Sequence, residues 1–437
     1  MKKITLFGIL FMIFQAGFIL SRASPYFVDS SKGSDTNPGT SAAHPWQTFD
    51  PVNAGNFAPG DTINFACGSV WHQTLIISSS GTKDNPIVYR SYGTGEKPLI
   101  SKLSPIKHDY EFYKSLKQYE ELSIPTVHIK GTWNIFEGFF IRDAPFAAIE
   151  LSEGADHNII RNCEISNSGL GVSAYSMYNL FTGNYVHDLF MIRDTPPEVH
   201  DDDDYGAVAF WMWNDNNEIS YNKAVHCEQH SFDYELDGGF VELLNAGDNT
   251  YIHHNWVERC NGLVESGSAK NVTIAHNVCL ESSDIFIFLH IWINSSGVAN
   301  IGNWKVEHNT VVRRYGRVRP SLINFGNVFI PPPPGTLYLR NNIFVLGGGP
   351  DVVHNVAPTG DFVHENNVYY MLPRAEVGYQ LGSGEIIADP AFVNEQLKDF
   401  RLKENSPAKT AGKKLDYTLN FNNEKYSADR KPNIGAY

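Results

Sequence analysis

One short pattern recurs through the middle of the sequence: an apolar residue, two variable residues, Asn, another variable residue and a second apolar residue. The copies read IIRNCEI, FTGNYV, ISYNKAV, IHHNWV, IAHNVCL, VEHNTV and LRNNIF, with a looser copy in VHENNVYY. The successive gaps between the asparagines are 22, 38, 33, 22, 32, 33 and 24 residues. The asparagines are Asn162, Asn184, Asn222, Asn255, Asn277, Asn309, Asn342 and Asn366. Repeats of this period are typical of solenoids, so the chain is expected to consist of stacked units.

Each unit of about 22 residues contains short runs of alternating apolar and polar residues, such as AAIELS, GFVELL and GLVESG, separated by Gly and Asn. Two or three strands of this length cannot bury their own apolar face, so successive units must stack. We therefore predict an all-β fold, a single right-handed parallel β-helix with the first seven asparagines in register. The longer gaps are then one unit plus a loop. A β-sandwich of hairpins is the alternative, but it does not explain an Asn at a fixed phase.

The two ends of the chain differ in composition from the repeats. Residues 1–23 have a basic start, an apolar run and the sequence Ser21-Arg22-Ala23, which predicts a secretory signal peptide; an uncleaved anchor is the alternative. Residues 24–100 are expected to form an N-terminal cap and the first coils, and residues 101–387 the β-helix with its loop insertions. Residues 388–437 have no Asn repeat and are expected to be a C-terminal cover. The protein is expected to be secreted or periplasmic.

The charge of the chain limits its partners. The formal net charge is −14, and removing the three positive charges of residues 1–23 leaves −17. Such an acidic protein is not expected to bind nucleic acid or highly sulfated polyanions. A polyuronate bound locally through a cation is still compatible with it. Outside the signal peptide no stretch is long and apolar enough to span a bilayer, so we expect no membrane insertion, and we expect a monomer.

Several longer segments resemble a known group of proteins. These are YFVDSSKGSDTNPGTSAAHPWQTF, GDTINFACGSVW, GTKDNPIVYRSYGTGEKPLIS and the closing DPAF…DFRLKENSPAKTAG. They are similar to the secreted β-helix proteins of the pectate-lyase-like superfamily, which includes polysaccharide lyases, glycoside hydrolases and epimerases. The resemblance covers essentially the whole mature chain. It implies a β-helix that acts on a polysaccharide or oligosaccharide, but not which reaction it catalyses, because one scaffold carries several chemistries.

Two glutamates occupy equivalent places in neighbouring units. Glu242 follows Val241 and precedes an Asn by 13 residues, and Glu265 follows Val264 and precedes an Asn by 12 residues. If both valines point inward, alternation turns both glutamates outward, side by side on strands about 4.8 Å apart. Glu150 has the same phase further back. Two such carboxylates repel, which raises one pKa and suits an acid paired with a base or nucleophile. A Ca²⁺ site or a solvated surface ladder are the alternatives.

The neighbouring coils and loops supply further candidates for the same face. The run FLHIWIN follows the second glutamate, and long insertions flank the pair. The predicted catalytic residues are Glu242, Glu265, Asp237 and His290. The predicted sugar contacts are Trp211, Trp213, Trp292, His230, Glu235 and Asn324. The run Asp201, Asp202, Asp203 and Asp204 is a candidate Ca²⁺ site, with a solvated loop as the alternative. Ca²⁺ is the only cofactor suggested, since the histidines lack the spacing of a zinc motif.

Three functions are compatible with these residues. A carboxylate pair about 5 Å apart favours a glycoside hydrolase of the retaining type. A lyase or epimerase acting on a uronate with Ca²⁺ is the second interpretation. The β-helix alginate lyases use a Lys on one coil and an Arg-His pair on the next, whereas here Glu stands in place of the Lys and Glu265-Ser266 in place of the pair. A noncatalytic carbohydrate-binding β-helix is the third. The insertions beside the pair favour an enzyme, and we expect the hydrolase.

Two of the five cysteines have related positions. Cys227 and Cys260 each lie five residues after a repeat Asn, so we expect them to be adjacent on neighbouring coils. That adjacency is compatible with a disulfide and equally with two buried thiols. The other three cysteines are expected to fill the core.

Overall fold

The computed structural model describes residues 23–102, 123–196, 204–244, 246–282, 285–289, 301–314, 321–325, 335–347, 354–356 and 362–437. The predicted signal peptide therefore lies outside the described residues, except for its last position. Residues 103–122 lie outside them as well. The described chain is almost entirely β, with one α-helix, α1 (Asp50–Ala54), and one 3-10 turn, η2 (Glu395–Leu397). No helix in the described part is long and apolar enough to cross a membrane.

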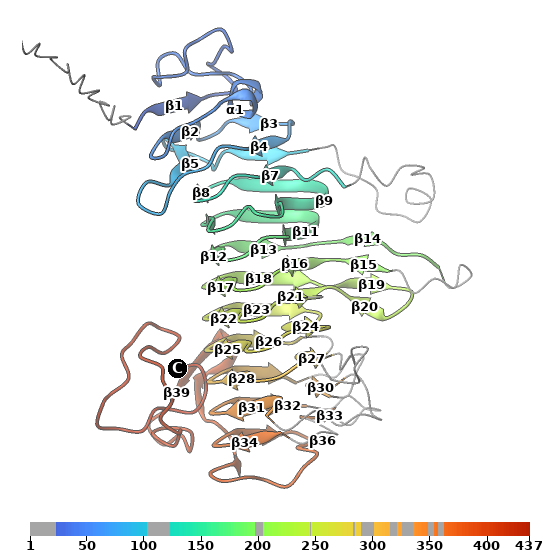
Figure 1. Cartoon of the computed structure of the whole chain (residues 1–437). Helices are drawn as coiled ribbons and strands as arrows, with labels where there is room; N and C mark the ends of the chain where they lie inside the picture. Colours follow the sequence, from blue (N-terminus) through green and yellow to red (C-terminus); the bar gives the residue numbers. More distant parts are fainter. Residues whose placement is uncertain are drawn as a thin grey trace, which may run out of the picture.

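The first sheet runs the length of the molecule with twelve parallel strands (Figure 1). In spatial order these are β1 (Pro25–Val28), β2 (Thr62–Ala66), β5 (Ile87–Tyr92), β8 (Asn134–Glu137), β10 (Ile159–Arg161), β12 (Leu180–Thr182), β17 (Glu218–Ser220), β22 (Tyr251–His253), β25 (Thr273–Ala275), β28 (Trp304–Glu307), β31 (Leu337–Arg340) and β34 (Val363–Glu365). Each coil contributes one strand, so strands that neighbour one another are one turn of the chain apart.

A second sheet follows the first along the chain. It contains β3 (Val70–Trp71), β6 (Leu99–Ser101), the first half of β9 (Phe140–Leu151) and of β11 (Glu164–Ala174), β13 (Tyr185–His187), β18 (Lys223–Cys227), β23 (Trp256–Cys260), β26 (Val278–Leu280), β29 (Thr310–Arg313), β32 (Ile343–Leu346), β35 (Val368–Met371) and β37 (Ile386–Ile387).

The third sheet completes each coil. It contains β4 (Leu75–Ile77), β7 (Val127–Ile129), the second halves of β9 and β11, β16 (Val208–Met212), β21 (Gly239–Leu243), β24 (Val264–Ser266), β27 (Ile287–Leu289) and β30 (Ile323–Asn324). Because β9 and β11 are long enough to continue from the second sheet into the third, these two sheets are joined there. The predicted parallel β-helix is confirmed.

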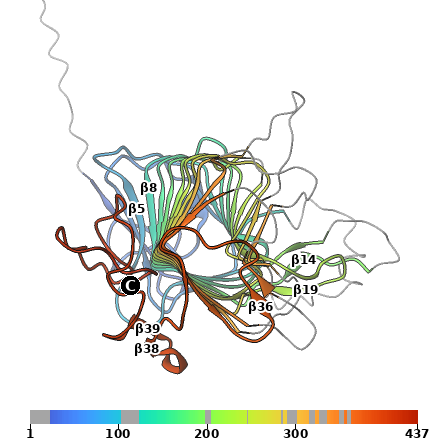
Figure 2. The ribbon, with the colours of Figure 1, turned by 90° about the horizontal axis from the view of Figure 1, so that it is seen from below.

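Four short pairs lie outside the three sheets. They are β14 (Met191–Arg193) with β15 (Tyr205–Gly206), β19 (Gln229–Ser231) with β20 (Glu235–Asp237), β33 (His354–Asn355) with β36 (Ala375–Glu376), and β38 (Phe392–Asn394) with β39 (Asp399–Leu402). The first two are antiparallel and project from the side of the third sheet (Figures 1 and 2).

The apolar residues stack inside the coils because alternation turns every second side chain inward. One inward row crosses the third sheet through residues paired strand by strand, each at most 2% exposed. It consists of Ile149, Val172, Phe210, Val241, Val264, Ile287 and Ile323. The expectation that both valines of the glutamate pair point inward is confirmed.

The repeated asparagines form a buried ladder at the turn between the first and second sheets. In the step from Asn222 to Asn255, the backbone N–H and the side-chain amide of Asn222 both donate to the Asn255 Oδ1, at 2.9 and 3.1 Å. The same pattern repeats on each coil, through Asn184, Asn222, Asn255, Asn277, Asn309, Asn342 and Asn367. Each buried amide is thus satisfied by the coil above or below, which fixes the stacking register.

The prediction was wrong at Asn162, and the looser copy is shifted too. The ladder position of that coil is Cys163, whose N–H donates to the Asn184 Oδ1 at 3.0 Å. Asn162 instead has a φ of 55°, and Asn366 a φ of 53°. Asn suits both this left-handed turn position and the ladder position that follows it, so the residue type alone does not distinguish the two positions. A second ladder, Asn134, Asn158, Asn179 and Asn217, was missed.

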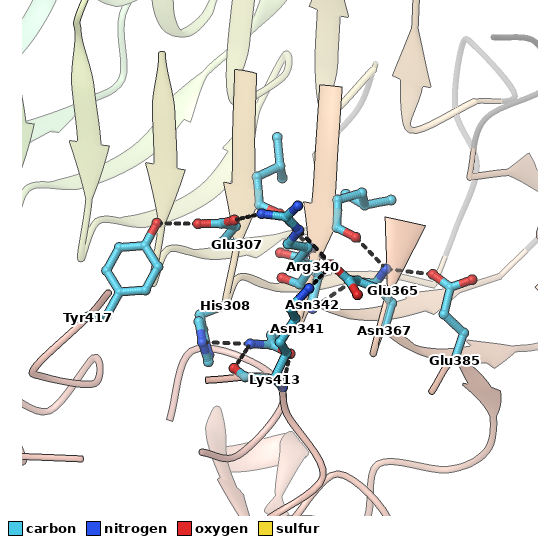
Figure 3. Close-up of polar contacts among 12 residues, drawn as sticks. Glu307, His308, Arg340, Asn341, Asn342, Glu365, Asn367, Glu385, Lys413 and Tyr417 are labelled. Atoms are coloured by element: carbon cyan, nitrogen blue, oxygen red, sulfur yellow. Dashed lines mark hydrogen bonds and ion pairs between the residues drawn. The ribbon is translucent and has the colours of Figure 1, made fainter. Parts of the chain in front are cut away.

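The main ladder ends at a buried glutamate. Asn367 donates its amide to Glu385 Oε1 at 2.6 Å, and Figure 3 shows Glu385 beyond Asn342 and Asn367 at this end of the row. Tyr369 donates to the same oxygen, while the other oxygen meets His364 and a backbone N–H. Glu385 therefore replaces the acceptor that a further coil would have provided.

The predicted neighbours Cys227 and Cys260 are confirmed as in-register partners on β18 and β23. Both are free thiols and fully buried, so of the two alternatives the structure shows the thiol pair. Burial raises the pKa of Cys227 well above its ordinary value, because the apolar core and the neighbouring thiol both disfavour a thiolate.

The tail 388–437 runs along the flank of the later coils rather than across their open end (Figures 1 and 2). Its apolar residues Phe392, Phe400 and Ile434 pack on the outer side of the second sheet. Further along it bonds to residues that precede the ladder, from Asn366 back to Tyr221. The tail thereby covers polar turns that would otherwise face water.

Candidate active site

The two glutamates are partners in one row on the outer face of the third sheet. Trp211 on β16 pairs with Glu242 on β21, Glu242 pairs with Glu265 on β24, and Glu265 pairs with Phe288 on β27. All four side chains are partly exposed, whereas the residues on either side of them are buried. The predicted side-by-side placement of the glutamates on one outward face is confirmed by this register. Glu150 lies in the same row, two strands before Trp211.

Two hairpins stand beside this row because their coils carry long insertions. Asp204, directly before β15, links them. Its carboxylate accepts the Ser231 hydroxyl at 2.8 Å and the N–H groups of Asp233 and Thr195 at 3.0 and 2.6 Å. In return, the Asp204 N–H donates to the Asp233 carboxylate at 3.1 Å. The β14–β15 and β19–β20 hairpins are thus held as one wall.

A pocket of about 250 Å³ lies between this wall and the glutamates. Four carboxylates belong to its lining: Asp204, Asp237, Glu242 and Glu265. The other lining residues are Tyr205, Trp211, Tyr234, Leu236, Leu244, Asn261 and Phe288. The lining residues that the structure describes thus include neither Lys, Arg nor His. The pocket combines acids with aromatic and apolar surface, which suits a sugar ring and its hydroxyl groups.

The pKa of Glu242 is raised well above its ordinary value. Burial is the largest cause, followed by repulsion from Glu265 and from Asp237. The Trp211 indole opposes this shift, since its N–H lies near enough to favour the charged carboxylate without reaching hydrogen-bond geometry. A carboxyl group with a raised pKa keeps its proton closer to neutral pH, as a general acid requires.

The structure brings together only part of the predicted site. Asp237 lies in the pocket with the glutamates, where its carboxylate accepts the N–H of Gly238 at 2.7 Å. Trp211 is a lining residue, but Trp213 stacks on Tyr175 with ring centroids 5.6 Å apart and is not part of the lining.

Three further candidates also lie away from the lining. His230 is exposed, with its Nδ1 at 3.6 Å from the Asp194 carboxylate. Glu235 is exposed near the turn of the β19–β20 hairpin. Asn324 pairs with Phe288 one strand beyond the pocket.

The remaining predicted residues are not placed. His290, Trp292, Asp201, Asp202 and Asp203 lie outside the described residues. The partner of Glu265 on the next strand is Phe288, because the inward residues there are Ile287 and Leu289. The outward position beside Glu265 on this strand therefore belongs to Phe288.

The described carboxylates do not form a metal site. Asp204 is only 5% exposed, and its bonds to Thr195, Ser231 and Asp233 use both of its oxygens within the hairpin wall. In the described part of the chain, no three His, Cys, Asp or Glu side chains converge so that they could hold one ion. Asp204 is thus engaged within the wall, and Asp201, Asp202 and Asp203 lie outside the described residues, so the Ca²⁺ site at the aspartate run stays a prediction.

Sequence reasoning missed six residues of the lining: Tyr205, Tyr234, Leu236, Leu244, Asn261 and Phe288. Three of them come from the hairpins, which have no repeat pattern that would give their orientation. Phe288 had a signal, since it stands between two residues that alternate inward. Asn261 lies at the turn after β23, and only the stacking of coils brings it to the pocket.

Comparisons with known proteins agree with this architecture. The family model described as the right-handed beta helix region matches residues 125–311. A lacto-N-biosidase of Bifidobacterium longum subsp. longum is 34% identical over 87 residues, and the match spans 18% of this chain and 5% of the length of that protein.

Two solved structures are similar over nearly the whole chain. Pectate lyase Pel9A has a TM-score of 0.58 and 16% identity, covering 94% of this chain and 96% of the other. XylC, solved in complex with xylose, has a TM-score of 0.56 and 12% identity, covering 94% of this chain and 98% of the other. The resemblance to β-helix proteins seen in the sequence is confirmed for the fold. The chain is a right-handed parallel β-helix protein.

Proposed function

We propose that this protein is a carbohydrate-degrading enzyme, a glycoside hydrolase that uses Glu242 and Glu265 as its catalytic pair. The observation that carries the proposal is the register of these two residues on adjacent strands inside one pocket, with the pKa of Glu242 raised. The local similarity to a lacto-N-biosidase supports a sugar substrate. Aromatic side chains at both ends of the row, Trp211 and Phe288, give flat surfaces on which a pyranose can pack.

In the proposed reaction Glu242 is the acid and Glu265 the nucleophile. Glu242 gives its proton to the glycosidic oxygen while the bond from that oxygen to the anomeric carbon breaks. The carboxylate of Glu265 attacks the same carbon and forms a glycosyl-enzyme. Glu242, now charged, takes a proton from a water molecule, whose oxygen displaces Glu265 and releases the sugar.

The spacing of the pair favours retention of anomeric configuration. Side chains paired across adjacent parallel strands start about 4.8 Å apart. Retaining glycosidases have carboxyl groups about 5–5.5 Å apart, and inverting enzymes need roughly 6.5–9.5 Å to leave room for a water molecule. Asp237 contributes to the raised pKa of Glu242 and lies where a sugar hydroxyl can donate to it.

An elimination reaction is the second candidate that the sequence suggested. It needs a positive charge to neutralise the uronate carboxylate. The described lining has four acids and no Lys, Arg or His, and the described carboxylates do not converge on an ion site. A bound uronate would therefore meet repulsion in this pocket, which is why the hydrolase is preferred. We also propose that residues 1–23 direct export, so that the enzyme acts outside the cytoplasm.

A polysaccharide panel with two readouts tests the reaction class. Hydrolysis produces new reducing ends without ultraviolet absorbance from unsaturated uronates, whereas elimination produces both. On a substrate that is cleaved, the proton NMR of the first product gives the anomeric configuration, and we expect retention. Reducing ends accompanied by the unsaturated absorbance would refute the hydrolase.

Single substitutions test the assignment of residues. Glu242→Gln and Glu265→Gln are each expected to lower kcat by about 10²–10⁴-fold or more while leaving the thermal transition cooperative. Glu150→Gln is the matched control, because Glu150 lies in the same outward row but away from the pocket, with its Oε1 3.3 Å from the Nε2 of His128. It is expected to keep kcat within about threefold of the parent. Full activity in both Gln variants of the pair would remove them from the mechanism.

A further inference from the structure

The C-terminal tail lies on a different side of the molecule from the hairpins of the candidate active site (Figures 1 and 2). It lines a second cavity. Its volume is about 370 Å³, within the range of roughly 300–1,000 Å³ typical of small-molecule sites. The floor is the turn residue His308, and the walls come from the tail between Lys414 and Pro432.

The charges in this cavity are opposite to those in the catalytic pocket. Lys414, Lys425 and Arg430 line it, and none of the described lining residues is Asp or Glu. The whole chain has a net charge of −14, yet residues 388–437 contain nine basic and seven acidic residues. A concentration of positive charge in an acidic protein attracts anions locally, because the field at short range is set by the nearest charges.

Two of these cations, Lys425 and Arg430, are exposed and form no ion pair among the described residues. The pKa of Glu404 is lowered mainly by its contact with Lys409, and the more distant Arg430 charge is a minor cause. Lys414 donates to the carbonyl of Ala428 at 2.5 Å, a contact that leaves its charge uncompensated. By contrast, the neighbouring Lys413 is paired with Glu365.

Two tyrosines give the cavity firm walls. Tyr417 donates its hydroxyl to Glu307 Oε2 at 2.6 Å, and Figure 3 shows it beside His308 on the inner side of the tail. The Tyr426 hydroxyl lies 2.9 Å from the Nε2 of His276. With both hydroxyl groups engaged, the rings are held in place, and Leu415 and Pro432 add apolar surface. Ordered aromatic and apolar surface beside polar donors is how proteins bind sugar rings.

We propose that this tail cavity, defined by Lys414, Lys425, Arg430, Tyr417 and Tyr426, binds an anionic sugar, one whose pyranose ring carries a carboxylate or a sulfate. The guanidinium and ammonium groups hold the anion, and the tyrosine walls contact the ring. Thr418 and Ser427, which also line the cavity, donate to sugar hydroxyls. The site binds without cleaving, since no pair of carboxylates lies in its described lining, and it would hold a glycan against the protein independently of the chemistry at Glu242.

A neighbouring cavity extends the site toward the first sheet. It measures about 410 Å³ and shares Lys414, Leu415 and Tyr417 with the first. Its lining also holds two further cations, Lys305 and Arg340, and two acids, Glu307 and Asp416. Glu307 is paired with Arg340 and accepts the Tyr417 hydroxyl. A glycan of two or three residues can therefore occupy both cavities, one on each side of Tyr417, which predicts that affinity increases with chain length up to this size.

Calorimetric titration of the full chain carrying Glu242→Gln, which prevents turnover, tests the proposal. The probes are trigalacturonate, its fully methyl-esterified form, a sulfated galactose trisaccharide and inorganic sulfate. We expect trigalacturonate or the sulfated trisaccharide to bind at least tenfold more tightly than the methyl ester, with affinity falling as salt is added. The stronger of the two identifies the anion. Inorganic sulfate is expected to bind more weakly than either, because it lacks the ring.

Charge-reversal variants locate the site. Lys425→Glu with Arg430→Glu should lower the affinity at least tenfold, and Lys425→Gln with Arg430→Gln should lower it to a smaller degree. Lys431→Glu is the matched control, since Lys431 is adjacent in sequence and exposed but does not line the cavity. Its affinity should stay within twofold. Equal binding of the methyl ester, no binding of either anionic trisaccharide, or an equal loss in the Lys431 variant would overturn the proposal.

Discussion

Acidic side chains have opposite surroundings in two regions, the flank covered by the tail and the pocket beside the hairpins. On the flank, Glu307 accepts from Tyr417 and Arg340, and Glu385 accepts from four donors (Figure 3). In the pocket, Glu242 stands next to Glu265 with no Lys, Arg or His among the described lining residues. Both arrangements follow from the same stacking of coils, which places like positions side by side.

This difference in surroundings distinguishes rows of the solenoid that stabilise the fold from rows that can carry out a reaction. Stacking equal residues is favourable for asparagine, because each amide both donates and accepts. It is unfavourable for glutamate, because an ionised carboxylate only accepts and its neighbour repels it. A repulsive pair kept in the middle of a stable stack costs stability, and such sites are where function is expected.

The largest expected effect is a loss of stability in mild acid. The loss should come from the contacts between the tail and the turns beneath it, and not from the third sheet. His254, His276 and His308 stack at about 5.0 Å between ring centroids, beneath the tail. Burial lowers the pKa of His254 and His308 to about 4, and lowers that of His276 well below its usual range. The groups that face this column are His253, Glu307, Tyr221, Tyr417 and Tyr426.

His308 shows why these rings must be neutral. The amide of Asn341 donates to its Nε2 at 2.9 Å, which requires that nitrogen to carry no proton. Asn341 cannot reverse its amide without losing its two bonds to the backbone of Lys413. A proton on His308 therefore costs this contact between coil and tail.

The lowered pKa values determine the direction of the pH effect. Because the folded pKa values are lowered, the unfolded chain binds more protons below about pH 6.5, so stability falls as pH decreases from there toward about 4. Each histidine contributes up to about 1.4 kcal/mol per pH unit in that window. Urea unfolding at pH 7, 6 and 5 measures the loss. His276→Gln should make the pH dependence less steep; an unchanged slope would contradict this account.

The next largest effect concerns the buried ladder. Asn255→Ala removes the acceptor of two Asn222 donors and two donor contacts of its own, and leaves buried polar groups unsatisfied. We expect a loss of about 3 kcal/mol in the free energy of unfolding. Asn249→Gly is the control, because Asn249 belongs to an exposed Asn row and has a φ of 59°, which Gly tolerates. It should cost less than about 1 kcal/mol. Equal losses in the free energy of unfolding of the two variants would show that burial does not cause the larger cost expected for Asn255→Ala.

A pair of isosteric changes compares the two regions directly. Glu385→Gln places an amide among four donors and is expected to lower stability by about 2 kcal/mol. Glu242→Gln removes a carboxylate whose charged form is disfavoured in the fold, so it should raise stability by about 1 kcal/mol. The raised pKa means that this gain grows as pH rises above the unfolded value near 4.3. Thermal melts at pH 5 and pH 8 check both. A destabilised Glu242→Gln would contradict the repulsion.

The smallest expected effect is a shift of the pH profile. Trp211→Phe removes the indole N–H that opposes the raised pKa of Glu242, so that pKa should rise further, by less than about one unit. If Glu242 is the acid, the alkaline limb of kcat against pH moves upward by the same amount. Tyr205→Phe, on the pocket wall, is the control and should leave the limb in place. An alkaline limb that does not move in Trp211→Phe would show that the indole does not influence the pKa of the catalytic acid.

Period and alternation are properties of the amino-acid sequence, and they carried the correct predictions. The spacing of the asparagines predicted the stacked coils, and the alternation around Val241 and Val264 predicted the outward pair on neighbouring strands, as the register shows. The failure at Asn162 has a clear cause. Ile160 and Ile165 align that coil correctly with Phe181 and Val186, which places Cys163 at the ladder position. The spacing of the apolar residues determines the register, whereas Asn suits both the left-handed turn position and the ladder position next to it.

The period and alternation of the amino-acid sequence establish the repeat, and with it the fold and the position of Glu242 beside Glu265. The surroundings of the two glutamates depend on long-range contacts instead. The hairpins that bring Tyr234 and Asp237 to the pocket, and the tail that covers the histidine column, follow no period. Their positions depend on contacts between residues far apart in the chain, such as Asp204 with Ser231 or Tyr221 with Asn423. Local spacing contains no information about such contacts, because they form only after the coils have stacked.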